Sequence, residues 1–166
     1  MAASRVCVVG SINADQTFVV HALPRPGQTV LASALTSTPG GKGGNQAVAA
    51  ARAGASVALV AAVGDDPAAE LLCGHLRANG VSVEAVTRIP GPSGSAVIVV
   101  DVVGENHIVV APGANAHLEV GSAAARTAVV NSEVILMQLE IPAPTAIAAA
   151  RLARAAGAVV ILRRSR

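Results

Sequence analysis

Short runs rich in Val, Ile and Leu alternate along the chain with Ala-rich segments of helical periodicity. The runs are typical of strands buried on both faces, and they cover residues 6–9, 56–63, 83–86, 134–139 and 158–162. The helices predicted from the other segments cover residues 45–53, 67–79, 118–130 and 144–156. This alternation predicts an α/β fold, in which a mostly parallel sheet carries helices on both faces.

A second group of extended segments has no helices between its members and predicts a small separate sheet. These segments cover residues 17–20, 29–34, 96–103 and 107–111. The first two are separated by Leu23-Pro-Arg-Pro-Gly27, whose prolines and glycine rule out continuous regular structure. The last two flank Gly104-Glu-Asn106 as the strands of a β-hairpin. We expect the hairpin to pair with the earlier segments, outside the main layer.

The composition fits one globular domain and disfavours a nucleic-acid partner. The chain has 166 residues, of which 52% are hydrophobic and 1% aromatic, so its core is built from aliphatic side chains. The formal net charge is +2, but three of the positive charges are Arg163, Arg164 and Arg166. With no aromatic stacking platform and no stripe of Lys and Arg, the sequence predicts no binding to nucleic acid.

Two cysteines, Cys7 and Cys73, lie in an apolar run and in a predicted helix. Because no charged-then-apolar leader precedes them, we expect a reduced, cytoplasmic protein with two buried thiols. The most membrane-like stretch, residues 47–63, is interrupted by Arg52, Gly54 and Ser56. We therefore predict no transmembrane segment.

The segment that follows the last predicted strand is unusual. Val159-Val-Ile-Leu162 is apolar throughout, as a strand covered on both faces would be, but Arg163-Arg-Ser-Arg166 follows it directly. A two-sided apolar strand at the edge of a sheet invites pairing with another chain. We interpret this pattern as a domain that is cut short after residue 162.

The strongest local signal for chemistry is the glycine-rich segment Gly40-Gly-Lys-Gly-Gly44, within an expected flexible loop at residues 39–44. Glycines let backbone amides approach a ligand closely, and the loop directly precedes a predicted helix N-terminus. Such a site suits an anion or a ligand rich in hydroxyls. It is not a Walker loop, because no Ser or Thr follows the lysine. The alternative is a simple mobile loop before Asn45, which would cap the helix.

Polar side chains follow two of the predicted parallel strands. Asn13 and Asp15 come shortly after the first strand, and Glu140 follows the strand at residues 134–139. Ligands of open α/β folds bind at the carboxyl ends of such strands. These residues are therefore candidates for hydrogen bonding to a ligand. The alternatives are a turn at Asn13 and Asp15, and a solvated strand end at Glu140.

Other polar residues are assigned structural roles. The four histidines, His21, His75, His107 and His117, show no metal-ligand spacing. Asp65-Asp66 before Pro67 is interpreted as the N-terminal cap of a helix. The serines lack a credible catalytic triad. We expect neither a metal site nor a nucleophilic serine.

Five blocks, in order along the chain, carry a resemblance to a known family. They are Val9-Gly-Ser-Ile-Asn-Ala-Asp15, Pro39-Gly-Gly-Lys-Gly-Gly-Asn-Gln-Ala47, Gly64-Asp-Asp66, Ala111-Pro-Gly-Ala-Asn115 and Met137-Gln-Leu-Glu140. Residues 40–64 also fit the first signature of the PfkB carbohydrate kinases. The sequence therefore resembles the ribokinase-type members of the PfkB carbohydrate kinase family.

The resemblance implies a ribokinase-like three-layer α/β/α sandwich with a small β-sheet lid, to which residues 17–37 and 95–111 are similar. In the family the parent reaction is the ATP-dependent phosphorylation of D-ribose to D-ribose 5-phosphate. It uses MgATP and a monovalent cation, and dimers commonly form through the lid. The sugar-binding residues that the resemblance implies are Asn13, Ala14, Asp15, Gly41, Lys42, Gly43, Gly44, Asn45 and Glu140.

The sequence also departs from the family pattern. Family chains are roughly twice as long, and they continue with Asn-Pro-Ala-Pro where Arg163-Arg-Ser-Arg166 stands here. The Asn-x-x-Glu segment linked to magnesium and the Gly-Ala-Gly-Asp motif, which supplies the catalytic Asp, are missing. We therefore interpret residues 1–162 as the N-terminal part of such a domain and 163–166 as an unmatched basic tail.

Three hypotheses follow from this partial match. The first is a truncated ribokinase-type kinase that keeps its sugar-binding residues but lacks the ATP site, so no cofactor is expected to bind fully and the chain is expected to be inactive. The second is a non-catalytic module that binds a pentose or pairs through the lid. The third is an unrelated α/β module that binds phosphates at Gly40–Gly44.

Overall fold

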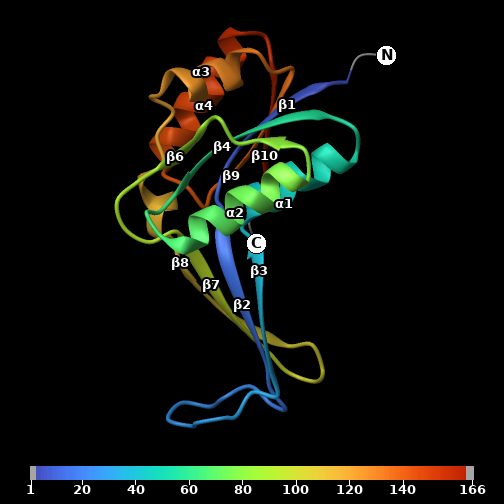
Figure 1. The fold of residues 1–166 in the computed structure, drawn as a ribbon, viewed down its shortest axis with the longest axis vertical. Coiled ribbons are helices and arrows are strands. Elements are labelled where there is room, and N and C mark those ends of the chain that lie inside the picture. Colours follow the sequence, from blue (N-terminus) through green and yellow to red (C-terminus); the bar gives the residue numbers. More distant parts are fainter. Residues whose placement is uncertain (1–2, 164–166) are drawn as a thin grey trace.

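The computed structural model describes residues 3–163 and has two parts, a layered body and a small sheet that projects from it (Figure 1). The body is built on a six-stranded sheet in which every pairing is parallel. Its strands are β1 (Arg5–Val9), β4 (Ser56–Val63), β5 (Val81–Ser82), β6 (Val86–Arg88), β9 (Val134–Gln138) and β10 (Val159–Arg163). The order across the sheet is β10-β9-β1-β4-β5, and β6 pairs with the far end of β4.

Four helices cover the two faces of this sheet. They are α1 (Lys42–Arg52), α2 (Pro67–Ala78), α3 (Ala123–Val130) and α4 (Ala143–Ala155). Val6 and Val8 of β1 pack in one core cluster with α1 and α2, whereas Cys7 and Val9 pack in a second cluster with α3 and α4. Successive residues of a strand point to opposite faces, so an apolar run such as β1 serves both cores. The predicted α/β fold with helices on both faces is confirmed.

The projecting part is a four-stranded sheet, which we call the small sheet (Figure 1). Its strands are β2 (Asn13–Val19), β3 (Ala34–Gly40), β7 (Gly94–Val100) and β8 (Asn106–Ala111), in the order β3-β2-β7-β8. The β2–β7 pair is parallel and the other two pairs are antiparallel. The predicted pairing of the hairpin with the earlier extended segments is therefore confirmed.

The glycine-rich segment differs most from its prediction. The strand expected at residues 29–34 is wrong, because β3 begins at Ala34 and continues to Gly40. The loop expected at 39–44 is correspondingly short, and α1 begins at Lys42 rather than at Asn45. Gly41, at φ +84°, makes the whole turn between them. Glycine here reflects tight packing rather than flexibility.

Other boundaries also shift. Asn13 and Asp15 lie in strand β2 and not in a turn. The helix predicted at 118–130 is replaced by a 3₁₀ helix, η1 (Gly113–His117), and the later α3. Ser122 caps α3 through a 3.1 Å hydrogen bond that its Oγ accepts from the Ala125 N–H, which fixes the late start.

Two short parallel strands, β5 and β6, replace the one predicted near residues 83–86. In the hairpin, the turn spans residues 101–105, because Asp101 Oδ1 accepts hydrogen bonds from the N–H groups of Val103 and Glu105. Asp side chains that bond to the following backbone favour turns.

The last strand, β10, lies at the edge of the body sheet and pairs only with β9 among the described strands. Its apolar side chains are half exposed, at 59% for Val159, 49% for Ile161 and 47% for Leu162. The strand extends to Arg163, one residue beyond the predicted end. The other three residues of the predicted basic tail, 164–166, lie outside the described residues.

The thiols of Cys7 and Cys73 are buried and unpaired, as predicted. Burial raises the pKa of Cys7 to about 12.

Across residues 3–163, no helix is both long enough and apolar enough to span a bilayer.

Asp66 caps α2 as predicted, and it also ties the small sheet to the body. Its Oδ1 accepts a 3.0 Å hydrogen bond from the Ala69 N–H. The Ser93 hydroxyl and Ser93 N–H donate 2.7 Å hydrogen bonds to Oδ1 and Oδ2. Ser93 Oγ in turn accepts a hydrogen bond from the Gly64 N–H at 2.9 Å. Residues 91–93, which lead into β7, are thereby held against the start of α2.

Replacing Asp66 with asparagine should lower the free energy of unfolding near neutral pH by about 1–2 kcal/mol, since an amide cannot accept all of these hydrogen bonds. Burial alone would raise the pKa of Asp66, but the bonds from Ser93 and Ala69 hold it below its usual value. Its stabilisation is therefore complete above the unfolded pKa and is lost as the pH falls through the lower folded pKa. Urea unfolding followed by circular dichroism between about pH 7 and pH 3 measures this loss.

The exposed neighbour Asp65 offers a matched control. Asp65→Asn should leave the free energy of unfolding near neutral pH almost unchanged. If Asp66→Asn and the unaltered protein lose stability in parallel on acidification, Asp66 does not act as described.

Candidate functional site

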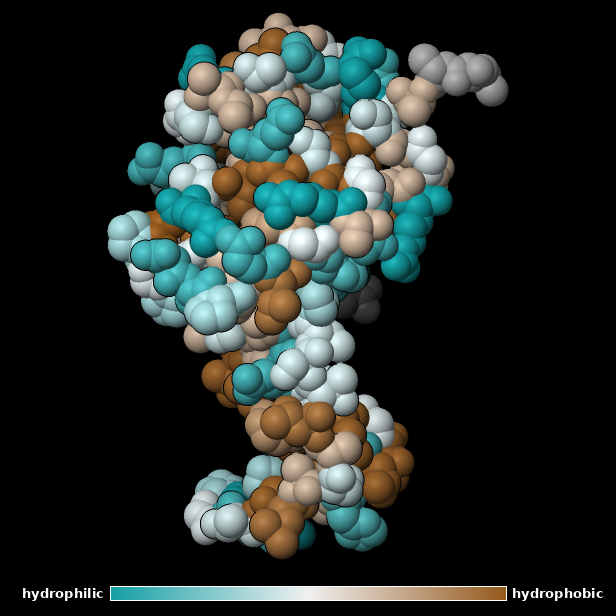
Figure 2. All heavy atoms as spheres, viewed as in Figure 1, coloured by the Kyte–Doolittle hydropathy of each residue, from teal (hydrophilic) through white to brown (hydrophobic). Residues whose placement is uncertain are grey.

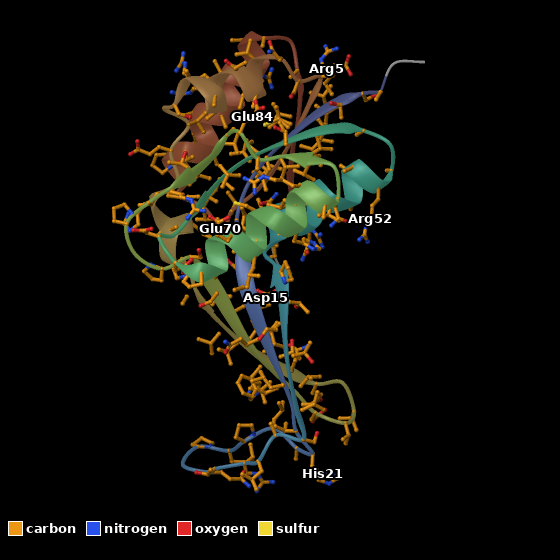
Figure 3. The ribbon with its side chains drawn as sticks, in the orientation of Figure 1. Arg5, Asp15, His21, Arg52, Glu70 and Glu84 are labelled. Atoms are coloured by element: carbon orange, nitrogen blue, oxygen red, sulfur yellow. The ribbon has the colours of Figure 1, made fainter. Side chains whose placement is uncertain are left out.

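The candidate site lies where the small sheet meets the carboxyl ends of β1 and β9, and Figure 3 labels Asp15 at this junction. Strand β1 ends at Val9, and the chain turns through residues 10–12 into β2, which carries Asn13 and Asp15. Glu140 follows β9, the neighbour of β1 in the sheet. Lys42 opens α1 directly after the Gly41 turn. Three segments thus deliver polar groups to one place.

Glu140 is held by two partners. Lys42 Nζ lies 2.8 Å from its Oε1, and the Ser11 hydroxyl donates a 2.8 Å hydrogen bond to its Oε2. Burial acts to raise the pKa of Glu140, but the hydrogen bonds and positive charge of Lys42, with the bond from Ser11, bring the pKa below its usual value. Glu140 is therefore a fixed, ionised carboxylate near neutral pH.

Asp15 is in the opposite situation. Burial, followed by the negative charge of Glu140, raises its pKa, although a hydrogen bond from the Gly41 backbone N–H works against this. Its Oδ1 atom is buried and has no hydrogen-bond partner among the described residues. A buried acceptor without a partner costs free energy, so it marks a place where a donor from a ligand would be favourable.

Glycines allow this close arrangement. A Cβ atom on Gly40 would collide with the carboxylate of Asp15. One on Gly43 would lie 2.7 Å from the carbonyl carbon of Gly10 and 2.8 Å from the nitrogen of Ser11. Gly44 donates its N–H to the carbonyl of Ser11 at 3.0 Å. The start of α1 therefore packs directly on the backbone that joins β1 to β2.

Asn13 is 4% exposed and shares the Asp15 face of β2, because residues two apart in a strand point the same way. Its Oδ1 accepts a 2.9 Å hydrogen bond from the Nδ2 of Asn115, which is itself 1% exposed. Asn115 thus joins η1 to the start of the small sheet.

The structure brings Asn13, Asp15, Gly41, Lys42 and Glu140 of the predicted site residues together. Two others lie apart from them. Ala14 points to the opposite face of β2, where it lines a small cavity with Pro39 and Leu72. The side chain of Asn45 is exposed, and it lies beside α2 with Leu72 and His75.

Sequence reasoning did not single out two polar residues of this region. Ser11 holds Glu140, and Asn115 holds Asn13. Both stand inside the ordered blocks that carried the family resemblance, at Val9–Asp15 and Ala111–Asn115. That position was the available signal, since neither residue type is unusual in a loop or turn.

Residues 3–163 contain no group of three or more His, Cys, Asp or Glu side chains placed to hold a metal ion. A magnesium ion held by protein side chains alone therefore has no site among these residues.

The chain is similar in sequence to known ribokinases. A ribokinase of Bacillus subtilis is 38% identical over 141 residues, which are 84% of this chain and 48% of that protein. A ribokinase of Haemophilus influenzae is 37% identical over 157 residues, 93% of this chain and 51% of that protein. The chain thus spans about half the length of these relatives.

A solved structure of Arabidopsis thaliana ribokinase complexed with ribose and ATP matches with a TM-score of 0.86 at 33% identity. The match covers 97% of this chain and 53% of that one, and it confirms the expected ribokinase-like fold. The sequence pattern of the pfkB family carbohydrate kinases matches residues 3–166. This chain therefore belongs to the pfkB carbohydrate kinase family.

Proposed function

We propose that this chain binds D-ribose and forms the sugar-binding half of a kinase that converts D-ribose and ATP to D-ribose 5-phosphate. The observation that carries the proposal is the buried, unpartnered Oδ1 of Asp15 beside the Lys42–Glu140 ion pair. Two ribokinases among the relatives and the ribose complex of the Arabidopsis protein support the choice of sugar.

Each residue of the cluster has a role in this proposal. The ionised carboxylate of Asp15 accepts hydrogen bonds from sugar hydroxyls, which are stronger than bonds between neutral groups. Glu140 accepts a further hydroxyl with an oxygen that Lys42 and Ser11 keep in place. The small sheet acts as a lid, corresponding to the predicted lid segments at 17–37 and 95–111, and excludes water from the bound sugar.

Phosphoryl transfer depends on positioning and on stabilisation of the transferred charge. We propose that the groups that the resemblance assigns to that step, including the catalytic Asp, lie outside these 166 residues. We propose that MgATP and a monovalent cation act in the full-length reaction, and that the 166-residue chain binds the sugar without turnover.

The alternative of a phosphate-binding module is disfavoured by charge. Two carboxylates, Asp15 and Glu140, stand beside the start of α1, and only Lys42 offsets them within the cluster. An anion at the glycine-rich segment would meet this negative charge, whereas a neutral polyol would not.

Isothermal titration calorimetry with D-ribose, and separately with inorganic phosphate, tests the proposal. We expect heat of binding with ribose and none with phosphate. Binding of phosphate without ribose would favour the third hypothesis and contradict the sugar binding that the first two propose. A coupled assay with ribose and MgATP addresses the absence of turnover, which kinase-like rates from the purified chain would contradict.

A second copy of the chain is the proposed partner, through the small sheet. Apolar side chains gather on this sheet (Figure 2), and those exposed are Leu35, Val97, Ile108, Val109 and Val110. Exposed apolar surface of this kind marks interaction sites.

We propose a cytoplasmic location, which the two unpaired cysteines support.

A further inference from the structure

Two hydrogen bonds with the backbone of Ile12 fix the orientation of the Asn115 side-chain amide. Its Oδ1 accepts a 3.0 Å hydrogen bond from the Ile12 N–H, and its Nδ2 donates a 3.0 Å hydrogen bond to the Ile12 carbonyl. A backbone N–H can only donate and a carbonyl can only accept. Ile12 therefore permits one orientation of the Asn115 amide, since the flipped orientation would place donor against donor and acceptor against acceptor.

The orientation of the Asn115 amide in turn determines the orientation of the Asn13 side-chain amide. The second proton of Asn115 Nδ2 faces Asn13 at 2.9 Å, so the atom of Asn13 that meets it must be the acceptor, Oδ1. Asn13 Oδ1 is thereby engaged, and the donor end of this amide, Nδ2, is the end that Asn115 leaves available. The polarity of the Ile12 backbone thus determines the polarity of the Asn13 side chain, two hydrogen bonds away.

Gly94 leaves room for this arrangement. A Cβ atom on Gly94 would collide with both Asn115 Nδ2 and Asn13 Oδ1. Asn13 and Gly94 are register partners on β2 and β7, so the pair of amides lies at the first residues of both strands. Both amides are almost fully buried, and both protons of Asn115 Nδ2 are used.

We propose that Asn115 is a positioning residue, which orients Asn13 so that the sugar site presents an Nδ2 donor beside the carboxylate acceptor of Asp15. This inference rests on the proposed function. The site then pairs one donor with one acceptor on the same face of β2, two residues apart. Neighbouring hydroxyls of a sugar match this pair when one accepts from Asn13 and the other donates to Asp15. The substrate class is a vicinal diol, and a ligand with only acceptors is rejected.

The first test needs no ligand. In isotope-labelled protein, scalar couplings across hydrogen bonds should run from Asn115 Nδ2 to the carbonyl carbon of Ile12 and to the side-chain carbonyl carbon of Asn13. A coupling in the opposite sense, from Asn13 Nδ2 to Asn115, overturns the proposal, and so does the lack of any coupling from Asn115. This result does not depend on whether ribose binds.

The second test is a double-mutant cycle on D-ribose affinity. Asn115→Asp retains the acceptor for the Ile12 N–H but removes the donors to Asn13 Oδ1 and to the Ile12 carbonyl. We expect it to weaken ribose binding roughly 10- to 100-fold, about as much as Asn13→Ala, through the loss of one sugar hydrogen bond. In the Asn13→Ala background, Asn115→Asp should cost little more, because Asn115 acts through Asn13.

Losses that multiply in the double variant would show that Asn115 acts independently of Asn13, and would overturn the proposal. Asn131→Asp is the control, because it makes the same change at an exposed residue after α3, beside the start of β1. It should leave the affinity unchanged. If Asn115→Asp fails to fold, the coupling measurement on the unaltered protein still decides. Lack of ribose binding by the unaltered protein would instead refute the proposed function.

Discussion

Replacing Asp15 with alanine should abolish measurable D-ribose binding while leaving the protein at least as stable as before. The carboxylate is the proposed acceptor for two sugar hydroxyls, and each charge-assisted hydrogen bond is worth about 1.5–3 kcal/mol. Losing both weakens binding by at least about 100-fold. Calorimetric titration with ribose measures this loss.

The stability half of this prediction follows from the raised pKa of Asp15, which burial and the charge of Glu140 cause. A carboxyl whose pKa is higher in the folded protein disfavours folding whenever it is ionised. That cost is present near neutral pH, and it disappears as the pH falls through the folded pKa towards the unfolded value. Removing the carboxyl therefore removes the cost, although the hydrogen bond from Gly41 is lost with it.

Gln16→Ala is the matched control for Asp15→Ala, since Gln16 is the exposed neighbour on the opposite face of β2. It should leave both ribose affinity and the melting temperature almost unchanged. Equal losses of affinity in the two variants would mean that the small sheet, and not the carboxylate, is responsible. Ribose binding to the unaltered protein should itself weaken on acidification, because protonation of Asp15 removes the charge that strengthens its hydrogen bonds.

Two adjacent glycines should respond in opposite ways to the same substitution. In Gly43→Ala, the added methyl group would lie 2.7–2.8 Å from backbone atoms of Gly10 and Ser11, which have no room to move as a flexible side chain would. We expect a loss of about 2–4 kcal/mol in the free energy of unfolding. The melting temperature should fall by roughly 5–15 °C.

In Gly44→Ala, the nearest atom to the added methyl group is Cγ2 of Ile12 at 3.8 Å, an ordinary contact. Alanine favours a helix over glycine by up to about 1 kcal/mol, so this variant should be as stable as the parent or more stable. Thermal unfolding followed by circular dichroism compares the two. Similar losses in both variants would contradict the packing of α1 on the β1–β2 connection.

The body of the fold was predictable because its signals are local. Each buried strand is an unbroken apolar run, and Asp66 before Pro67 marks the start of α2 through cap chemistry. The glycine-rich segment misled for a physical reason. Glycine has a low propensity for regular structure, yet here it is required inside a strand and a helix, at Gly40 by the carboxylate of Asp15 and at Gly43 by the backbone of Gly10 and Ser11.

The site was predictable only as a set of candidates. The positions after β1 and β9 indicated polar groups at one edge of the sheet, and Asp15 and Glu140 do lie there. The contacts themselves join residues far apart in sequence, such as Ser11 to Glu140, which are 129 positions apart. No pattern along the chain encodes such a pairing, nor the single orientation that Ile12 imposes on Asn115.

The way in which the small sheet is attached determines how it can move. The chain crosses between the body and the sheet at Asn13, Gly40, Gly94 and Ala111, and these positions are register partners or lie one residue from one. A sheet joined to the body by one connection could rotate freely about it. Four connections in one row instead hold this end of the small sheet in place. The sheet then bends about this row. We expect its far end, about 20 Å away along the strands, to move farther than Asp15, which lies two residues from this row.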